Sequence, residues 1–142
     1  SRLISLHTLK AGEYIASQLD IHEDDEVHYI RRVRLVDNIA VLIEDSYIPC
    51  TIIDIIPESV LQNGSLYEFI ENKTGRKIKF YNSVIEASLF DDALSALLAC
   101  ETGLPMLKVS GITKLEDGKT FNYSISYNRA DKFKIKNSWV GK

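Results

Sequence analysis

The alternation of apolar and polar residues along the chain predicts that much of it forms β-strands. A period of two residues places apolar side chains on one face of a strand and polar side chains on the other. Asp37-Asn38 and Asp117-Gly118 are turn-forming pairs, so we expect each to join two neighbouring strands as a hairpin. The predicted strands are 3–6, 27–36, 39–47, 77–88, 105–115, 119–128 and 131–135.

Four segments carry the signals of helices. Some show apolar residues at helical spacing, and others are rich in good helix formers. Ser65 begins one of them, with Glu68 three residues later at the spacing of a capping box, and Gly75 ends it. The predicted helices are 12–19, a short turn opened by Pro57 and broken by Asn63-Gly64, 65–75 and 90–100.

The order of these elements predicts the α+β fold class. Helices and strands mix without the regular strand–helix–strand rhythm of a parallel sheet, and the tight turns favour antiparallel pairing. At 142 residues the chain is long enough for one domain with a sizeable core. We therefore expect a single antiparallel sheet covered by helices.

Composition narrows the class of protein. Apolar residues make up 45% of the chain and charged residues 26%, as in a soluble globular domain. No apolar run approaches the roughly 20 residues of a membrane span, and no leader is recognisable, so we expect a cytoplasmic protein without membrane contact. Cys50 and Cys100 lack metal-ligand spacing and are expected to be buried free thiols. A net charge of −3 argues against nucleic-acid binding by this chain itself.

The hairpin over 27–47 concentrates the charges that could carry chemistry. Arg32 and Arg34 lie on one face of the first strand, and the second strand is apolar up to Glu44. Charges are costly on strands that pack in a core, so these three either pair with each other or receive a charged ligand. Arg31 extends the basic cluster, but its apolar neighbours suit a pocket better than a DNA-facing stripe.

The register of this hairpin decides whether the three charges meet. A two-residue loop pairs Arg32 with Ile43 and places Glu44 on the opposite face. An odd-numbered loop, often bulged, pairs Arg32 with Glu44 and Arg34 with Leu42, so that all three charges share one face. One positive charge is then left over, which suits an anion. The alternative is a cross-strand salt bridge with a spare solvated arginine.

Ser65 and Tyr67 are candidates at the start of the third predicted helix. The unpaired N–H groups and partial positive charge of a helix N-terminus attract phosphate. Ser65 can donate its hydroxyl to a phosphate oxygen, or it can simply cap the helix. Tyr67 can line the same hollow, or it can serve as ordinary packing.

A polar strand face near the C-terminus offers further contacts. Asn122, Ser124, Ser126 and Asn128 alternate along 119–128 and put hydroxyl and amide groups on one side. Such a face either meets water or suits the hydroxyl groups of a sugar, which need donors and acceptors in fixed places.

Several kinds of site lack their signature in the sequence. His7, His22 and His28 have no metal-ligand spacing and are interpreted as surface or strand-edge residues. There is no glycine-rich phosphate loop, nucleophile elbow or catalytic Cys/His arrangement. No catalytic residue, metal site or cofactor is therefore predicted.

An ordered set of short motifs runs along nearly the whole chain. The motifs are Ser1-Arg2-Leu3-Ile4-Ser5, Tyr14-Ile15-Ala16, Arg32-Val33-Arg34 with Glu44, Tyr47-Ile48-Pro49, Ser65-Leu66-Tyr67, Glu86-Ala87, Leu104-Pro105-Met106-Leu107, and Tyr127 with Arg129-Ala130-Asp131-Lys132-Phe133. With these motifs the chain resembles the effector-binding (UTRA) domain of GntR-superfamily, HutC-subfamily bacterial transcriptional regulators. The resemblance implies a chorismate lyase-like fold for residues 1–142.

The resemblance also implies a ligand sensor rather than an enzyme. In the family an N-terminal winged helix-turn-helix domain, absent from this chain, binds operator DNA. The C-terminal domain dimerises and binds a small metabolite. Matched to the family's pocket, an anion such as phosphate would be held by Arg32, Arg34 and Ser65. The polar or sugar part would be held by Glu44, Tyr67, Asn122 and Asn128.

The departures from the family pattern bear on the ligand. Members that bind amino-sugar phosphates carry glutamate at the position of Asn122 and often tyrosine at Asn128, which argues against an amino sugar and leaves phosphate recognition intact. We expect a homodimeric regulator, a repressor, that responds to a phosphorylated sugar or similar anionic metabolite. The alternatives are a small enzyme like chorismate lyase, acting on an anionic substrate, and a dimerisation module whose pocket has decayed.

Overall fold

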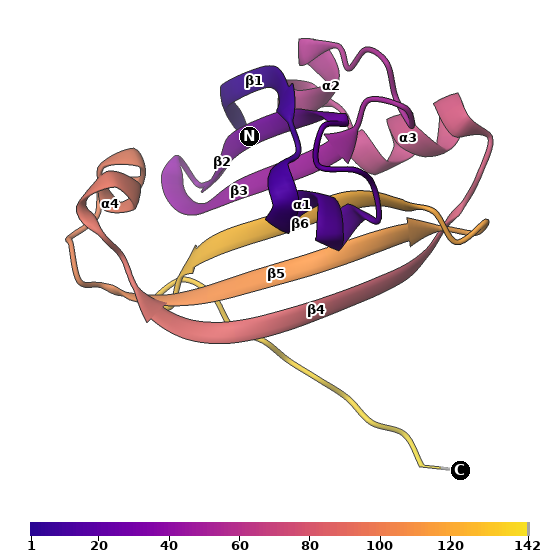
Figure 1. The fold of residues 1–142 in the computed structure, drawn as a ribbon. Coiled ribbons are helices and arrows are strands. Elements are labelled where there is room, and N and C mark those ends of the chain that lie inside the picture. Colours follow the sequence, from indigo (N-terminus) through magenta and orange to yellow (C-terminus); the bar gives the residue numbers. More distant parts are fainter. Residues whose placement is uncertain (142) are drawn as a thin grey trace.

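The computed structural model describes residues 1–141, and its strands form one six-stranded sheet (Figure 1). The strand order is β1-β2-β3-β6-β5-β4, and every neighbouring pair is antiparallel. The strands are β1 (Arg2–Lys10), β2 (Glu26–Val36), β3 (Ile39–Pro49), β4 (Ile78–Leu89), β5 (Pro105–Leu115) and β6 (Thr120–Arg129). This arrangement confirms the predicted α+β class with a single antiparallel sheet.

Within residues 1–141, four helices accompany the sheet, close to the predicted positions. Ser65 precedes one of them, and its hydroxyl accepts a hydrogen bond from the Glu68 N–H at 3.2 Å, the expected cap. Asp91 caps another by accepting from the Leu94 N–H at 2.8 Å. The helices are α1 (Gly12–Leu19), α2 (Glu58–Asn63), α3 (Leu66–Thr74) and α4 (Asp92–Leu98).

The helices divide the core between the two faces of the sheet. Because successive side chains of a strand point to opposite faces, Ile30 lies on one face of β2 while Val27 and Val33 lie on the other. Helices α2 and α3 pack on the face of Ile30. Helix α1 packs near Val27 and α4 near Val33, both on the opposite face. Arg32 and Arg34, which belong to the site described below, lie on the same face of β2 as Ile30.

The hairpin between β2 and β3 has the register that brings the charges together. Its turn is the two-residue pair Asp37-Asn38, both with positive φ (51° and 65°). A bulge follows, in which Val41 has no partner across the hairpin, and it shifts the pairing by one residue. Arg32 therefore pairs with Glu44, as predicted for a bulged hairpin, although the turn itself has two residues.

Three sequence-based expectations need correction. The predicted strand 131–135 does not form, and this segment runs away from the body of the domain (Figure 1). His28, expected at the surface or a strand edge, is buried on an inner strand, with Nε2 2.7 Å from the Ile53 carbonyl oxygen. Cys50 and Cys100 are free, as expected, but only half-buried. Within residues 1–141, every helix is too short or too polar to cross a membrane.

Candidate functional site

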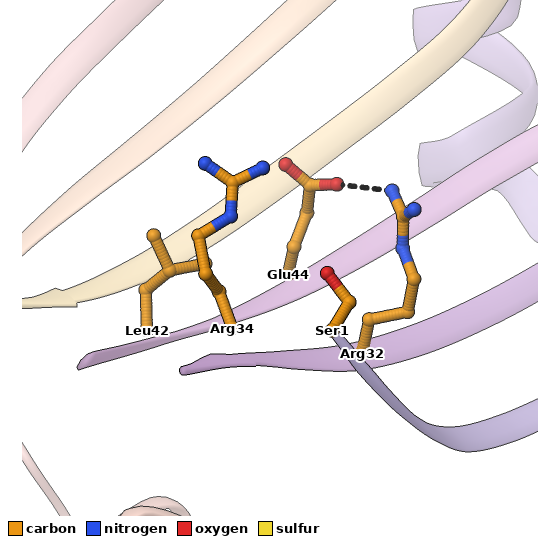
Figure 2. Close-up of a pocket in the computed structure, with 5 residues that line it drawn as sticks. All are labelled: Ser1, Arg32, Arg34, Leu42 and Glu44. Carbon is orange, nitrogen blue, oxygen red and sulfur yellow. Dashed lines mark hydrogen bonds and ion pairs between the residues drawn. The ribbon is translucent and has the colours of Figure 1, made fainter. Parts of the chain in front are cut away.

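The hairpin of β2 and β3 places Arg32, Arg34 and Glu44 on one face of the sheet, which we call the arginine face. Arg32 donates from Nη2 to Oε1 of Glu44 at 2.7 Å. The two side chains are 16% and 35% exposed, so the ion pair is partly shielded from water. Figure 2 shows Glu44 between the two arginines, with the guanidinium of Arg34 turned toward the carboxylate. Ser1 and Leu42 complete the lining of this small hollow.

Arg34 leaves an excess of positive charge on the arginine face. Among the ion pairs formed within residues 1–141, none includes Arg34. Two guanidinium groups and one carboxylate therefore carry a net charge of +1 at this place. A guanidinium offers planar, paired N–H donors that fit carboxylate and phosphate oxygens. The charge and the N–H donors at this place are suited to an oxyanion.

Tyr67, Thr113 and Asn122 form a second polar group on the same face. The Tyr67 hydroxyl lies 3.3 Å from Oγ1 of Thr113 and 3.5 Å from Nδ2 of Asn122. The Tyr67 ring meets Phe121 edge-on at a centroid distance of 5.6 Å. Asn122 is 2% exposed, and its Oδ1 has no hydrogen-bond partner among the described residues. An unpaired buried acceptor costs about 1–3 kcal/mol, so a donor brought to Oδ1 would stabilise this group.

Ser65 does not join either polar group through a described hydrogen bond. Its hydroxyl is engaged in capping α3, and the residue is exposed. A role for Ser65 in holding an anion stays a prediction, and the observed use is the capping alternative.

Asn128 has a structural use within the sheet. The residue is buried, and its Nδ2 donates to the Leu107 carbonyl oxygen and to Oγ of Ser126, both at 2.9 Å. It shares a face with Arg34, because it pairs with Leu42 and Leu42 pairs with Arg34. Its amide hydrogens are thus already engaged, and effector contact by Asn128 stays a prediction.

Arg31 belongs to the opposite face of the sheet. Its Nε and Nη2 donate to the two carboxylate oxygens of buried Asp45 at 2.6 and 2.7 Å. This hydrogen bond raises the pKa of Arg31. Burial, followed by the charge of Asp45, raises the pKa of Tyr29, whose hydroxyl donates to the same carboxylate at 3.0 Å. The basic cluster seen in the sequence is therefore split, with only Arg32 and Arg34 on the arginine face.

Tyr81 is a residue of the arginine face that the sequence analysis missed. It lies on β4, and its ring packs directly against the backbone of Gly111 on β5. An isolated glycine inside a predicted strand marks a close approach of other atoms to the backbone. Gly111 within 105–115 was thus the signal that could have pointed to this contact.

Comparison with known proteins identifies the family to which the chain belongs. The sequence profile of the UTRA domain matches residues 1–134. The transcriptional repressor NagR of Bacillus subtilis is 30% identical over 94% of this chain and 54% of its own length. The mannosyl-D-glycerate transport/metabolism system repressor MngR of Escherichia coli is 25% identical over 95% of this chain and 56% of its own length.

A solved structure has the same fold. The crystal structure of a GntR-family transcriptional regulator from Enterococcus faecalis superposes with a TM-score of 0.91 and 24% identity, covering 97% of this chain and 99% of that one. The chain spans about half the length of the curated relatives that it matches. These relatives and neighbours are transcriptional regulators, which confirms the expectation of a non-enzymatic protein. The chain belongs to the UTRA domain family, the effector-binding domains of GntR-family transcriptional regulators.

Proposed function

We propose that this domain binds a phosphorylated sugar, or a similar anionic metabolite, and thereby changes operator binding by the full-length regulator. The observation that carries the proposal is the position of Arg34, whose guanidinium lies beside the Arg32–Glu44 ion pair and takes part in no ion pair of the described residues. A phosphate monoester, with a charge of about −1.5 to −2 at pH 7, would more than neutralise the excess charge and would be held by both arginines. Glu44 would then accept hydrogen bonds from ligand hydroxyls.

The second polar group supports the sugar part of the proposal. Tyr67 and Asn122 offer a phenol and a buried amide whose oxygen lacks a partner. A neutral amide oxygen accepts a hydrogen bond from a hydroxyl group, whereas a carboxylate would favour a cationic amine. We therefore propose a hydroxyl-bearing rather than an amino sugar. One relative, MngR, is named for mannosyl-D-glycerate transport and metabolism, which is consistent with a ligand derived from a sugar.

The proposed regulator is a cytoplasmic repressor. NagR and MngR are both named as repressors. Operator DNA would be bound by a separate helix-turn-helix domain of the full-length protein, because this chain is acidic overall. An effector can shift operator binding only if it binds two arrangements of the regulator with different affinity.

The proposed assembly is a homodimer in which β4 lies at the interface. This strand forms one edge of the sheet, and all but its first residue are exposed. Val84 is 62% exposed on the face opposite to the arginines. A long edge strand with exposed apolar residues is a ready surface for pairing with another chain.

Sedimentation analysis tests this assembly. We expect the wild-type domain to sediment as a dimer and Val84→Glu to sediment as a monomer. Ile55→Glu, at an apolar residue that is 73% exposed outside the sheet, is the matched control and should remain dimeric. A dimeric Val84→Glu variant would place the interface elsewhere.

Thermal melting against paired sugars and sugar phosphates tests the ligand class. Glucose, glucosamine and trehalose, each with and without phosphate, form the first panel. A ligand at a hundred times its dissociation constant stabilises the folded domain by about 2.7 kcal/mol. We expect stabilisation by phosphorylated members alone. Stabilisation by unphosphorylated sugars would contradict the anion site, and no stabilisation by any anion would favour a dimerisation module.

A further inference from the structure

We propose that Tyr81, lying on Gly111, is a specificity-determining residue that forms an aromatic wall of the effector site and receives the C–H face of a sugar ring. The inference rests on the anion site proposed above and deepens it. It assigns the ligand to the cyclic sugar phosphates rather than to small linear anions.

The ring of Tyr81 lies unusually close to the backbone of Gly111. A Cβ atom built at Gly111 would lie 2.5 Å from Cε1 and 2.7 Å from the hydroxyl oxygen of Tyr81. Such distances do not occur between real side chains, so only glycine at position 111 lets the hydroxyl end of the ring rest on the sheet. Glycine within a strand costs roughly 0.5–1 kcal/mol relative to alanine. A side chain at position 111 would force the ring of Tyr81 to move from this position.

The pairing of the strands places this ring on the arginine face. Gly111 pairs with Ser124, and Ser124 pairs with Ser46. The next row along the same strands is Ser126, Glu44 and Arg32. In the row beside the charged residues, β3 and β6 thus carry Ser46 and Ser124, and β5 carries only the backbone of Gly111, on which the ring of Tyr81 rests.

Tyr81 lies within electrostatic reach of both polar groups. Burial raises its pKa most, a hydrogen bond with Ser83 opposes this rise, and the nearby Tyr67 and Glu44 raise the pKa further. The phenol is thus near both the Tyr67 group and the arginine group, and these two groups share no hydrogen bond among the described residues. It is the side chain that would make the two groups parts of one site.

The chemistry of this wall indicates a ring-shaped ligand. Tyr81 is 54% exposed, so part of its ring surface is available for contact. Aromatic rings contribute large apolar contact areas with a defined geometry, and the C–H face of a pyranose is a complementary surface. The arginines supply an anion site at one end, and the free Oδ1 of Asn122 supplies an acceptor for a hydroxyl near Tyr67.

Titration calorimetry with glucose 6-phosphate and inorganic phosphate tests the wall. We expect the wild-type domain to bind glucose 6-phosphate at least ten-fold more tightly than inorganic phosphate. Tyr81→Ala and Gly111→Ala should abolish most of this difference while leaving the affinity for inorganic phosphate unchanged. Tyr81→Phe, which keeps the ring, should retain the difference.

Phe80→Ala is the matched control, because Phe80 is the neighbouring exposed aromatic residue on the opposite face of β4. It should bind both probes like the wild-type domain, and it also controls for effects on assembly through β4. Thermal melting checks that each variant is folded. A Tyr81→Ala variant that keeps the full preference for glucose 6-phosphate would overturn the inference, as would a wild-type domain without that preference. If neither glucose 6-phosphate nor inorganic phosphate binds to the wild-type domain, the anion site at Arg34 is itself contradicted.

Discussion

Arg31 and Arg32 are consecutive residues of β2, and their guanidinium groups form ion pairs on opposite faces of the sheet. Arg31 binds Asp45 with two hydrogen bonds of 2.6 and 2.7 Å, and Arg32 binds Glu44 with one of 2.7 Å. The acids are likewise consecutive in β3 and follow from the same register. Asp45 is buried and also accepts from the Tyr29 hydroxyl, whereas Glu44 is 35% exposed and borders a hollow with Arg32. One pair is suited to holding the two strands together and the other to binding a ligand.

The two pairs should differ in their effect on stability. Asp45→Asn leaves Arg31 with an uncompensated charge in a largely buried place, so we expect the free energy of unfolding to fall by about 3 kcal/mol. Glu44→Gln opens a partly exposed pair and should change it by less than about 1 kcal/mol. Urea denaturation of the two variants measures the difference. Equal losses would show that both pairs serve mainly to stabilise the sheet.

The two asparagines of β6 should also differ in their effect on stability. Asn128→Leu removes a buried donor that satisfies the Leu107 carbonyl, and we expect a loss of about 1–3 kcal/mol in the free energy of unfolding. Asn122→Leu removes an amide whose oxygen is unpaired, so the change should stay within about 1 kcal/mol. Chemical denaturation gives both values. A large loss for Asn122→Leu would indicate that its amide is structural.

Stability should decline at alkaline pH because of buried tyrosines. Burial, with a contribution from the hydrogen bond to Tyr14, raises the pKa of Tyr123 to about 12. An unfolded chain loses this phenolic proton near pH 10, whereas the folded domain keeps it until about pH 12. The proton is thus bound more strongly in the folded state, so the stability that Tyr123 contributes is fully present below pH 10 and falls as pH rises through this window.

Urea midpoints between pH 8 and pH 11.5 test this dependence. Tyr123→Phe should lessen the decline, because one titrating phenol is gone while Tyr29, whose pKa is also raised, still contributes. Tyr14→Phe, which removes the same hydrogen bond but keeps the buried phenol, should retain most of it. Identical pH profiles for Tyr123→Phe and the wild-type domain would show that Tyr123 does not contribute.

The sequence predicted those parts of the fold and site that follow from local periodicity. The strand alternation and the turn pair Asp37-Asn38 predicted the central hairpin, but two registers stayed open, and the structure has the one that pairs Arg32 with Glu44. That register arises from a bulge at Val41 rather than from a longer turn. Bulge position depends on packing against both neighbouring strands, which a single strand's sequence does not contain.

The errors arose where tertiary partners decide the outcome. Residues 131–135 alternate like a strand, but neither edge of the sheet receives them, and alternation without a partner does not make a strand. His28 was assigned to the surface or a strand edge because the sequence shows no metal-ligand spacing or carboxylate partner for it, yet the Ile53 carbonyl gives it a buried partner. Tyr81 was missed because its position depends on Gly111, thirty residues later in the chain.

Binding of a phosphorylated sugar to paired arginine variants tests the central claim most directly. The phosphorylated sugar that stabilises the domain most in the melting panel is titrated calorimetrically into the wild-type domain, Arg34→Ala and Arg76→Ala. Arg76 is a matched control, because it forms an ion pair with Asp117 and does not line the arginine hollow. We predict at least a ten-fold loss of affinity for Arg34→Ala and none for Arg76→Ala. Unchanged affinity in Arg34→Ala would contradict the account.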